Sequence, residues 1–253
     1  MSDPLRERLQ RGERLVSGWL HFPSPFAAEV MARAGWDTLT LDFQHGMFGF
    51  DTALSMIQAV QTTDTPIIAR IPSGDLALAM KCLDAGVEGI IAPMIETSED
   101  CAALVSACRY PPIGTRSLGP TRSILRSGPL TPQQANTRVA VLPMIETARA
   151  LENLEAIAAV PGVDGLFVGP GDLGLSLYGE SRLDADDPAF LSILSRVADT
   201  ASAHGIAAGL FTLNPTYART AIALGYRLVA VSSDVRLLSG AARSTVDAVK
   251  ADA

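Results

Sequence analysis

The feature that most constrains how this chain can fold is a series of short apolar runs that recurs along its length. Most of these runs are continuously apolar instead of alternating with polar residues, which is typical of strands buried on both faces of a parallel sheet. We expect eight such strands, at residues 15–20, 38–43, 67–71, 89–94, 139–144, 165–169, 206–211 and 228–233.

Segments with a helical pattern separate the runs. Several of them end in a glycine two or three residues before the next run, as in ARAGWD, LDAGVEG and IALGYR, and glycine suits the left-handed position after a helix. Another, PFAAEVMARAG, places Phe26, Val30, Met31 and Ala34 on one helical face. Eight alternating strand and helix units in 253 residues predict a (β/α)8 TIM barrel, with residues 1–253 in one domain. A doubly wound open sheet is the alternative, although no GxGxxG motif follows the first run.

Composition and charge narrow the class of protein. With 48% hydrophobic and 19% charged residues, the chain is typical of soluble globular proteins, and its net charge of −7 argues against nucleic acid or an anionic membrane as a partner. The charged N-terminus lacks the apolar stretch of a signal peptide, and no apolar run approaches the roughly 20 residues that span a bilayer. The three cysteines form no CxxC pair, so we expect buried, reduced thiols in a cytoplasmic protein.

An internal repeat marks the middle of the chain. The pentapeptide PMIET occurs at residues 93–97 and again at 143–147, each time at the end of an expected strand. The segment between them includes residues 109–137, which are rich in Pro, Gly, Ser and Arg. We expect this segment to be a long loop with little regular structure, and long loops within compact domains are often functional.

Polar residues gather at the expected carboxyl ends of the strands, where barrels of this kind carry their active sites. The set comprises Asp42, Gln44, His45, Arg70, Glu96, Glu146, Asp172, Thr212, Ser232, Ser233 and Asp234, with His21 after the first strand. Glu146 and Asp172 follow neighbouring strands and could hold a hard cation such as Mg²⁺ or Mn²⁺, or could simply cap helices. His45 could act as a base near neutral pH or be a structural histidine.

Other residues of these strand ends could contact a substrate. Arg70 needs an anion in a barrel mouth, either a substrate carboxylate or Asp42. The GPGDLG motif opens a helix whose free N–H groups could bind an anion. Phe211 could form a wall of the pocket or pack within the barrel, and Arg116 in the long loop could reach a substrate anion or pair with an acid. The only lysines, Lys81 and Lys250, lie away from the strand ends, which argues against a Schiff-base mechanism.

Taken together, six stretches resemble the HpcH/HpaI family of class II, metal-dependent pyruvate aldolases. They are LDFQHG, PIIARIP, CLDAGVEGIIAPMIET, RYPPIGTRSLG, VLPMIET and GVDGLFVGPGDLG, and they occur in order between about residues 15 and 240. The match is closest to members that accept hydroxypyruvate as well as pyruvate. The resemblance implies a (β/α)8 barrel and a divalent metal, Mg²⁺, Mn²⁺ or Co²⁺, bound by Glu146 and Asp172.

The resemblance also implies roles for other residues. His45 is the general base, Asp84 raises its basicity, and Arg70 stabilises the enolate. The backbone N–H groups of Gly171 and Asp172 bind the carboxylate of the donor. The family further implies a homohexamer built from dimers that exchange a C-terminal helix.

Three positions depart from the family pattern. Gln44 stands where many members have a glutamate, so the negative charge beside His45 is missing. Met144 stands where the best-known aldolase of the family has a glutamine that contacts the substrate, and that hydrogen bond does not carry over. Gly171 replaces an alanine but still offers its N–H.

We therefore expect a metal-dependent aldolase that joins the enolate of pyruvate or hydroxypyruvate to an aldehyde, reversibly, with small molecules as its partners. A carbon–carbon lyase acting on a CoA thioester, like the citrate-lyase β-subunit, is one alternative. A non-catalytic barrel that binds carboxylates is another. Of the two PMIET glutamates, we expect Glu146 to serve the metal and Glu96 not to, because only Glu146 has a second carboxylate, Asp172, beside it.

Overall fold

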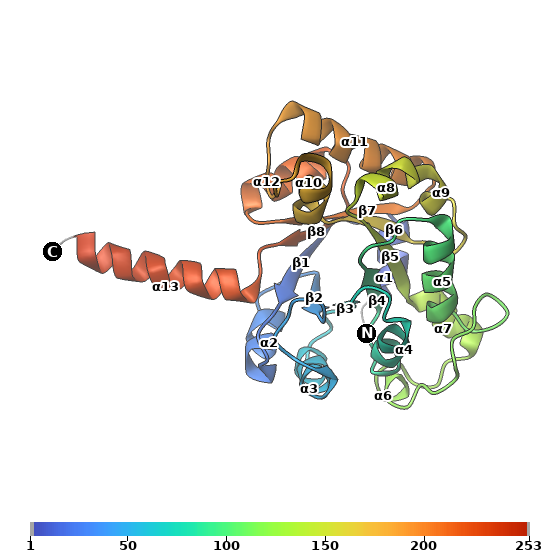
Figure 1. Cartoon of the computed structure of the whole chain (residues 1–253). Coiled ribbons are helices and arrows are strands. Elements are labelled where there is room, and N and C mark those ends of the chain that lie inside the picture. The colour runs from blue at the N-terminus through green and yellow to red at the C-terminus, as the bar shows by residue number, and fades with distance from the viewer. Residues whose placement is uncertain (1–2, 252–253) are drawn as a thin grey trace.

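A closed barrel of parallel strands forms the centre of the computed structural model, which describes residues 3–251 (Figure 1). Each strand pairs in parallel with the next in the chain, and the last pairs back with the first. All eight expected runs contain a strand, so the predicted (β/α)8 barrel is confirmed. The strands are β1 (Leu15–Leu20), β2 (Thr38–Asp42), β3 (Ile67–Arg70), β4 (Gly89–Ala92), β5 (Ala140–Ile145), β6 (Gly165–Val168), β7 (Ala207–Thr212) and β8 (Leu228–Val231).

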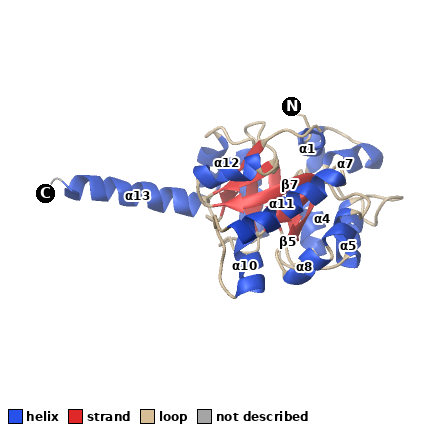
Figure 2. Cartoon of the chain, turned by 90° about the horizontal axis from the view of Figure 1, so that it is seen from above, coloured by secondary structure: helices blue, strands red, loops and turns tan. Residues whose placement is uncertain are grey.

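Helices surround the barrel (Figure 2). They are α1 (Leu5–Gln10), α2 (Pro25–Ala32), α3 (Phe50–Val60), α4 (Leu76–Asp84), α5 (Ser98–Cys108), α6 (Ser123–Ser127), α7 (Pro132–Arg138), α8 (Ala148–Glu152), α9 (Leu154–Ala158), α10 (Pro170–Tyr178), α11 (Pro188–Ala203), α12 (Pro215–Ala223) and α13 (Asp234–Ala251). Several of these helices are preceded by an N-cap residue whose side chain accepts a backbone N–H, for example Ser24 before α2 and Asn214 before α12.

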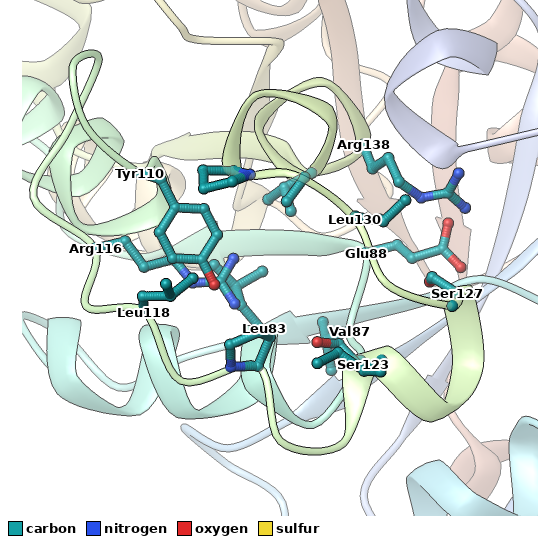
Figure 3. A pocket seen from close by; sticks show the side chains of 17 residues that line it. Leu83, Val87, Glu88, Tyr110, Arg116, Leu118, Ser123, Ser127, Leu130 and Arg138 are labelled. Atoms are coloured by element: carbon teal, nitrogen blue, oxygen red, sulfur yellow. The ribbon is translucent and has the colours of Figure 1, made fainter.

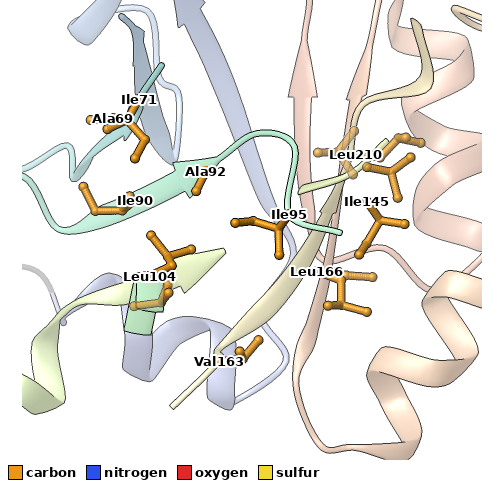
Figure 4. Packing of buried hydrophobic residues seen from close by; sticks show 14 of the residues in the cluster. Ala69, Ile71, Ile90, Ala92, Ile95, Leu104, Ile145, Val163, Leu166 and Leu210 are labelled. Carbon is orange, nitrogen blue, oxygen red and sulfur yellow. The ribbon is translucent and has the colours of Figure 1, made fainter. Parts of the chain in front are cut away.

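The hydrophobic core has two parts because each strand is buried on both faces. One cluster fills the inside of the barrel and includes Trp19, Ile68 and Phe167, together with Leu5 and Leu9 of α1. The larger cluster lies between the strands and the outer helices (Figure 4). Because α1 lies before β1 and contributes to the inner cluster, it closes the amino-terminal end of the barrel. The carboxyl ends of the strands therefore form the open end.

Two regions differ from the expectations. The segment 109–137 is not structureless, because it contains α6 and most of α7, and α7 begins with a capping box formed by Thr131 and Gln134. On α2, the face that carries Phe26 and Val30 is largely open to solvent, with exposed fractions of 75% and 56%. Helix α2 instead buries Ala28 and Ala32.

The last helix, α13, projects away from the barrel (Figure 1). It is tied to the barrel at its first residue, where the Asp234 carboxylate accepts the backbone N–H groups of His21 and Phe22 at 2.9 and 3.0 Å. Most of its remaining residues are exposed, including Leu238, Val246 and Val249.

Two further expectations concern membrane crossing and the state of the cysteines. Within residues 3–251, no helix combines the length and the apolar character that a membrane crossing requires. Cys82, Cys101 and Cys108 are free and buried, as expected, and burial raises the pKa of each thiol to about 12.

Candidate active site

A pocket opens at the carboxyl ends of the strands, and residues from six strand ends and from α13 line it. Seven residues singled out in the sequence lie along this pocket: His21, His45, Arg70, Met144, Gly171, Asp172 and Phe211. The full lining is Trp19, His21, His45, Arg70, Met144, Phe167, Gly169, Pro170, Gly171, Asp172, Leu183, Phe211, Leu213 and Arg236.

The Asp42 carboxylate organises one side of the pocket. It is fully buried, and the register of β2 against β3 places Asp42 directly beside Arg70. Arg70 binds it with two nitrogens, Nε at 2.9 Å and Nη2. Trp19 Nε1 and His21 Nε2 donate to the same carboxylate at 3.0 and 2.8 Å. The partner of Arg70, which the sequence left open, is therefore Asp42.

These contacts determine the charge state of Asp42. Burial opposes its ionisation, but the hydrogen bonds from His21, Arg70 and Trp19, together with the charge of Arg70, hold its pKa well below the usual range. Asp42 is therefore a carboxylate that fixes its neighbours and is not a proton donor. Arg70 uses Nε and Nη2 for this contact, which leaves Nη1 available to a ligand in the pocket.

The two histidines of the pocket are held differently. Because Asp42 is ionised, His21 must donate from Nε2, so the lone pair of the neutral ring is on Nδ1. The imidazole of His45 is exposed, and it is the backbone N–H of this residue that donates to Asp42, at 3.1 Å. The side chain of His45 is therefore free to meet a ligand, whereas the ring of His21 has a fixed orientation.

Glu146 lies beneath the pocket and is almost completely buried. Its Oε1 accepts the backbone N–H of Met94 at 2.8 Å, and its Oε2 has no hydrogen-bond partner among residues 3–251. Burial, helped by the charge of Asp172, raises the pKa of Glu146 to about 7 despite the Met94 hydrogen bond and the charge of Arg70. A buried, unpaired carboxylate oxygen beside a second carboxylate is the arrangement that a divalent cation would stabilise.

The backbone around Glu146 and Asp172 fits such a cation site. A Cβ atom at Gly169 would lie 2.5 Å from Glu146 Oε2, so only glycine leaves this oxygen open towards the pocket. Asp172 lies in the first turn of α10, and the N–H groups of Gly171 and Asp172 lie at the unpaired N-terminus of that helix. Two carboxylates with remaining positions for substrate oxygens and water are what Mg²⁺ prefers.

The two PMIET copies have the same sequence, but their glutamates lie in different surroundings. Glu96 in the first copy reaches the surface, where its Oε2 lies 3.4 Å from Nη1 of Arg149. Met94 of the same copy has a φ angle of 56°, which is unusual for a residue other than glycine, and in this conformation its N–H reaches Glu146 of the second copy. One copy thus helps to position the glutamate of the other.

Asp84 does not reach this pocket within the chain. It is the last residue of α4, which leads into β4, so it lies at the amino-terminal end of the barrel. His45 follows β2 and lies at the opposite end. Asp84 instead accepts a hydrogen bond from Arg116 Nη2 at 2.7 Å, which also shows that Arg116 pairs with an acid.

Aromatic and charged residues that the sequence did not single out complete the pocket. Trp19 contacts Phe211 edge-to-face, with the ring centroids 5.3 Å apart, and the Arg70 guanidinium lies 5.0 Å from the Trp19 centroid. Arg236 reaches the pocket from the first turn of α13. The sequence analysis missed Trp19 because it lies within an apolar run, and Arg236 because it lies beyond the last strand. The position of Trp19 near the end of a strand could have identified it as a pocket residue.

A family model, curated relatives and a solved structure all match most of this chain. The family model for HpcH/HpaI aldolase/citrate lyase matches residues 17–241. A hydroxypyruvate/pyruvate aldolase of Rhizorhabdus wittichii is 37% identical over 235 residues, which cover 93% of this chain and 94% of the relative. A 2-keto-3-deoxy-L-rhamnonate aldolase of Klebsiella pneumoniae is 33% identical, with 100% of this chain and 95% of the relative covered. The crystal structure of an HpcH/HpaI family protein from Burkholderia cenocepacia matches with a TM-score of 0.90 and 34% identity, over 97% and 98% of the two chains.

Proposed function

We propose that this chain, which belongs to the HpcH/HpaI aldolase/citrate lyase family, is a class II aldolase that requires a divalent metal and joins the enolate of pyruvate or hydroxypyruvate to an aldehyde. Relatives that are 33% and 37% identical over most of the chain are aldolases, so the protein is a carbon–carbon lyase. The relative from Rhizorhabdus wittichii supports hydroxypyruvate and pyruvate as donors.

The observation that carries the metal dependence is Glu146. Its buried Oε2 is unpaired, it lies beside Asp172, and Gly169 leaves it open to the pocket. In our proposal Glu146 and Asp172 hold Mg²⁺, Mn²⁺ or Co²⁺. A bound cation of this kind would act as a Lewis acid that stabilises negative charge on the keto oxygen of the donor.

The side chains of the pocket supply the remaining chemistry. The backbone N–H groups of Gly171 and Asp172 bind the donor carboxylate at the N-terminus of α10. His45, whose imidazole is exposed to the pocket, removes the C3 proton of the donor. Arg70, held by Asp42, directs Nη1 towards the developing negative charge. Phe211 and Trp19 form an apolar wall against which the aldehyde packs.

A direct assay of carbon–carbon bond formation tests this proposal. The protein is incubated with glycolaldehyde and either pyruvate or hydroxypyruvate, with Mg²⁺ or with EDTA, and the products are followed by NMR. We expect a hydroxy-2-oxo acid only when the metal is present. Turnover restricted to CoA thioesters would instead favour the citrate-lyase type, and binding of the donor without any product would favour a non-catalytic barrel.

We further propose a homo-oligomer, for which the family resemblance implies a hexamer. The projecting helix α13 supports it, because it exposes several apolar residues, among them Leu238, Val246 and Val249, and an apolar surface gathered on one exposed helix indicates contact with another protein. Phe26 on α2 is exposed as well. The role of Asp84 beside His45 also requires Asp84 of a neighbouring copy, because the two residues lie at opposite ends of one barrel. Light scattering coupled to gel filtration tests this proposal, and a monomer at micromolar concentration would contradict it.

The free, buried cysteines support a reducing compartment, and we propose the cytoplasm. Separation of cell fractions followed by immunoblotting tests this localisation.

A further inference from the structure

Two of the three histidines of this chain line the candidate active site, and only one of them, His45, has a role in the proposed reaction. The other is His21. The third histidine, His204, lies at the surface, where its Nε2 is 2.9 Å from a carboxylate oxygen of Glu155. A cavity at the amino-terminal end of the barrel, between the α4–β4 connection and residues 110–139, contains none of the three (Figure 3). His21 is therefore a titratable side chain of the pocket that still lacks a role.

The position of His21 along its strand places it beside the apolar wall of the pocket. Side chains two residues apart in a strand lie on the same face, and Trp19 of β1 belongs to the cluster inside the barrel. His21 follows β1 directly and continues that face to the pocket, where 25% of its side chain is exposed. Since Trp19 contacts Phe211 with the ring centroids 5.3 Å apart, His21 lies next to the wall against which the aldehyde packs in the proposed reaction.

Hydrogen bonds hold both the backbone and the ring of His21. Its N–H donates to Asp234 at 2.9 Å, and its carbonyl oxygen accepts the N–H of Met47 at 3.1 Å. Its ring Nε2 lies 2.8 Å from Oδ2 of the buried Asp42. Because Asp42 is ionised, Nε2 keeps its proton, and any proton that the ring gains or gives up is on Nδ1.

The charges around His21 suit a ring that carries two protons. The groups that hydrogen-bond to His21 or to Asp42 carry two negative charges, on Asp42 and Asp234, and one positive charge, on Arg70. A protonated His21 forms an ion pair with Asp42 and balances these charges. A buried carboxylate bonded to one ring nitrogen fixes the tautomer of a histidine and stabilises the imidazolium during proton transfer.

His45 has a different environment. Within residues 3–251, no hydrogen bond holds its imidazole, and only its backbone N–H contacts Asp42. His45 and His21 follow the neighbouring strands β2 and β1, so one pocket contains a free imidazole and an oriented one. An aldol addition needs two proton transfers, one from C3 of the donor and one to the oxygen of the aldehyde, and the two histidines match this requirement.

We propose that His21 is the acid that protonates the aldehyde oxygen as the carbon–carbon bond forms. The inference rests on the proposed aldolase function and adds the proton transfer that His45 does not perform. In the reverse reaction, neutral His21 accepts the proton of the same hydroxyl group on Nδ1 as the carbon–carbon bond breaks.

The protons and electrons of this step balance. C3 of the enolate attacks the carbonyl carbon of the aldehyde, and the π electrons of the C=O bond move to its oxygen. That oxygen takes the Nδ1 proton of His21, which becomes neutral and keeps its Nε2 proton on Asp42. His45 holds the proton that left C3, and both rings return to their starting states by exchange with solvent.

Two reactions of the full-length protein separate the roles of the histidines. Exchange of the C3 protons of pyruvate in D₂O with Mg²⁺ needs no aldehyde, whereas condensation of pyruvate with glycolaldehyde needs both proton transfers. In His21→Gln the side-chain NH2 group can donate to Asp42 as Nε2 does, but it cannot supply a proton. We expect condensation to slow by roughly 100-fold or more, and exchange to stay within about twofold of wild type.

His204→Gln is the matched control and should leave both rates unchanged, because His204 lies at the surface. Circular dichroism verifies the fold of each variant, and His21→Asn offers a shorter amide with the same expected result. Equal losses of exchange and condensation in His21→Gln would overturn the inference, because they would show that His21 only holds Asp42 in place. Unchanged condensation would also overturn it and would mean that water protonates the oxygen. Wild-type protein that catalyses neither reaction would instead contradict the aldolase function itself, and the inference with it.

Discussion

The most demanding structural prediction concerns Asp42→Asn, which changes one oxygen of a buried carboxylate to an NH2 group. Oδ1 of Asp42 accepts from Arg70 Nε and from two backbone N–H groups of the turn that follows β2. Oδ2 accepts from Trp19 Nε1, His21 Nε2 and Arg70 Nη2. Either orientation of the asparagine amide would point its NH2 group at three donors. The substitution also leaves the Arg70 guanidinium, which is mostly buried, without its counter-charge.

Removal of one partner of a buried, hydrogen-bonded ion pair costs about 3–5 kcal/mol, and we expect the free energy of unfolding to fall by that amount at pH 7. Urea unfolding followed by circular dichroism measures it, with the slopes of wild type and variant compared to verify that the same surface is exposed. Glu29→Gln is the control. It breaks the exposed pair of Glu29 with Arg33 and should cost no more than about 0.5 kcal/mol.

The pH dependence of the difference in free energy of unfolding between wild type and Asp42→Asn supplies a second check. The folded protein holds the pKa of Asp42 below that of an unfolded aspartate, about 3.9, so the ionised side chain stabilises the fold at every pH above that value. This stabilisation is lost as the pH falls below about 4 towards the lower pKa of the folded state. The wild type should therefore lose its advantage over Asp42→Asn in acid. A variant that is as stable as wild type at pH 7, or a difference that grows as the pH falls, would refute the reasoning.

Three further predictions follow from the same contacts. Glu146→Ala should weaken Mn²⁺ binding in calorimetry by more than about 100-fold, whereas Glu96→Ala, at the surface, should leave the dissociation constant unchanged. Equal losses of affinity in the two variants would refute the different roles of the two glutamates. Met94→Gly relieves a positive φ angle and should raise the free energy of unfolding by up to about 1 kcal/mol, whereas Met144→Ala, in the buried strand β5, should lower it by about 2–5 kcal/mol in the same urea assay. Phe211→Ala removes the contact with Trp19 and should raise kcat/KM for bulky aldehydes relative to glycolaldehyde, and an unchanged ratio would place Phe211 outside the acceptor site.

The sequence was sufficient for the barrel because its physical requirements are local. Strands buried on both faces must be apolar, and glycine must follow many of the helices, so the pattern is visible without any long-range contact. The helices α6 and α7 were not predicted because both lie among prolines and glycines that resemble a loop. Helix α6 has no side-chain cap, and Thr131, which caps α7, precedes a proline. The exposure of Phe26 was not predicted because a helical apolar face does not reveal whether the same chain covers it.

The candidate site was predictable only in part. Their positions at the ends of expected strands predicted that four polar residues share one end of the barrel: His45, Arg70, Glu146 and Asp172. The partner of Arg70 depends on the register between β2 and β3, which the sequence does not encode locally. A motif match gave Asp84 a role beside His45 but could not show that α4 carries it to the opposite end of the barrel.

Exchange of the C3 protons of pyruvate in D₂O tests the central claim most directly, because it needs the metal and the base but no aldehyde. NMR should show loss of the methyl signal with Mg²⁺ or Mn²⁺. The exchange should stop with EDTA and in His45→Ala and Glu146→Ala, and it should persist in Glu96→Ala. Exchange that continues in EDTA, or that survives Glu146→Ala and stops in Glu96→Ala, would contradict a metal-dependent aldolase built on Glu146.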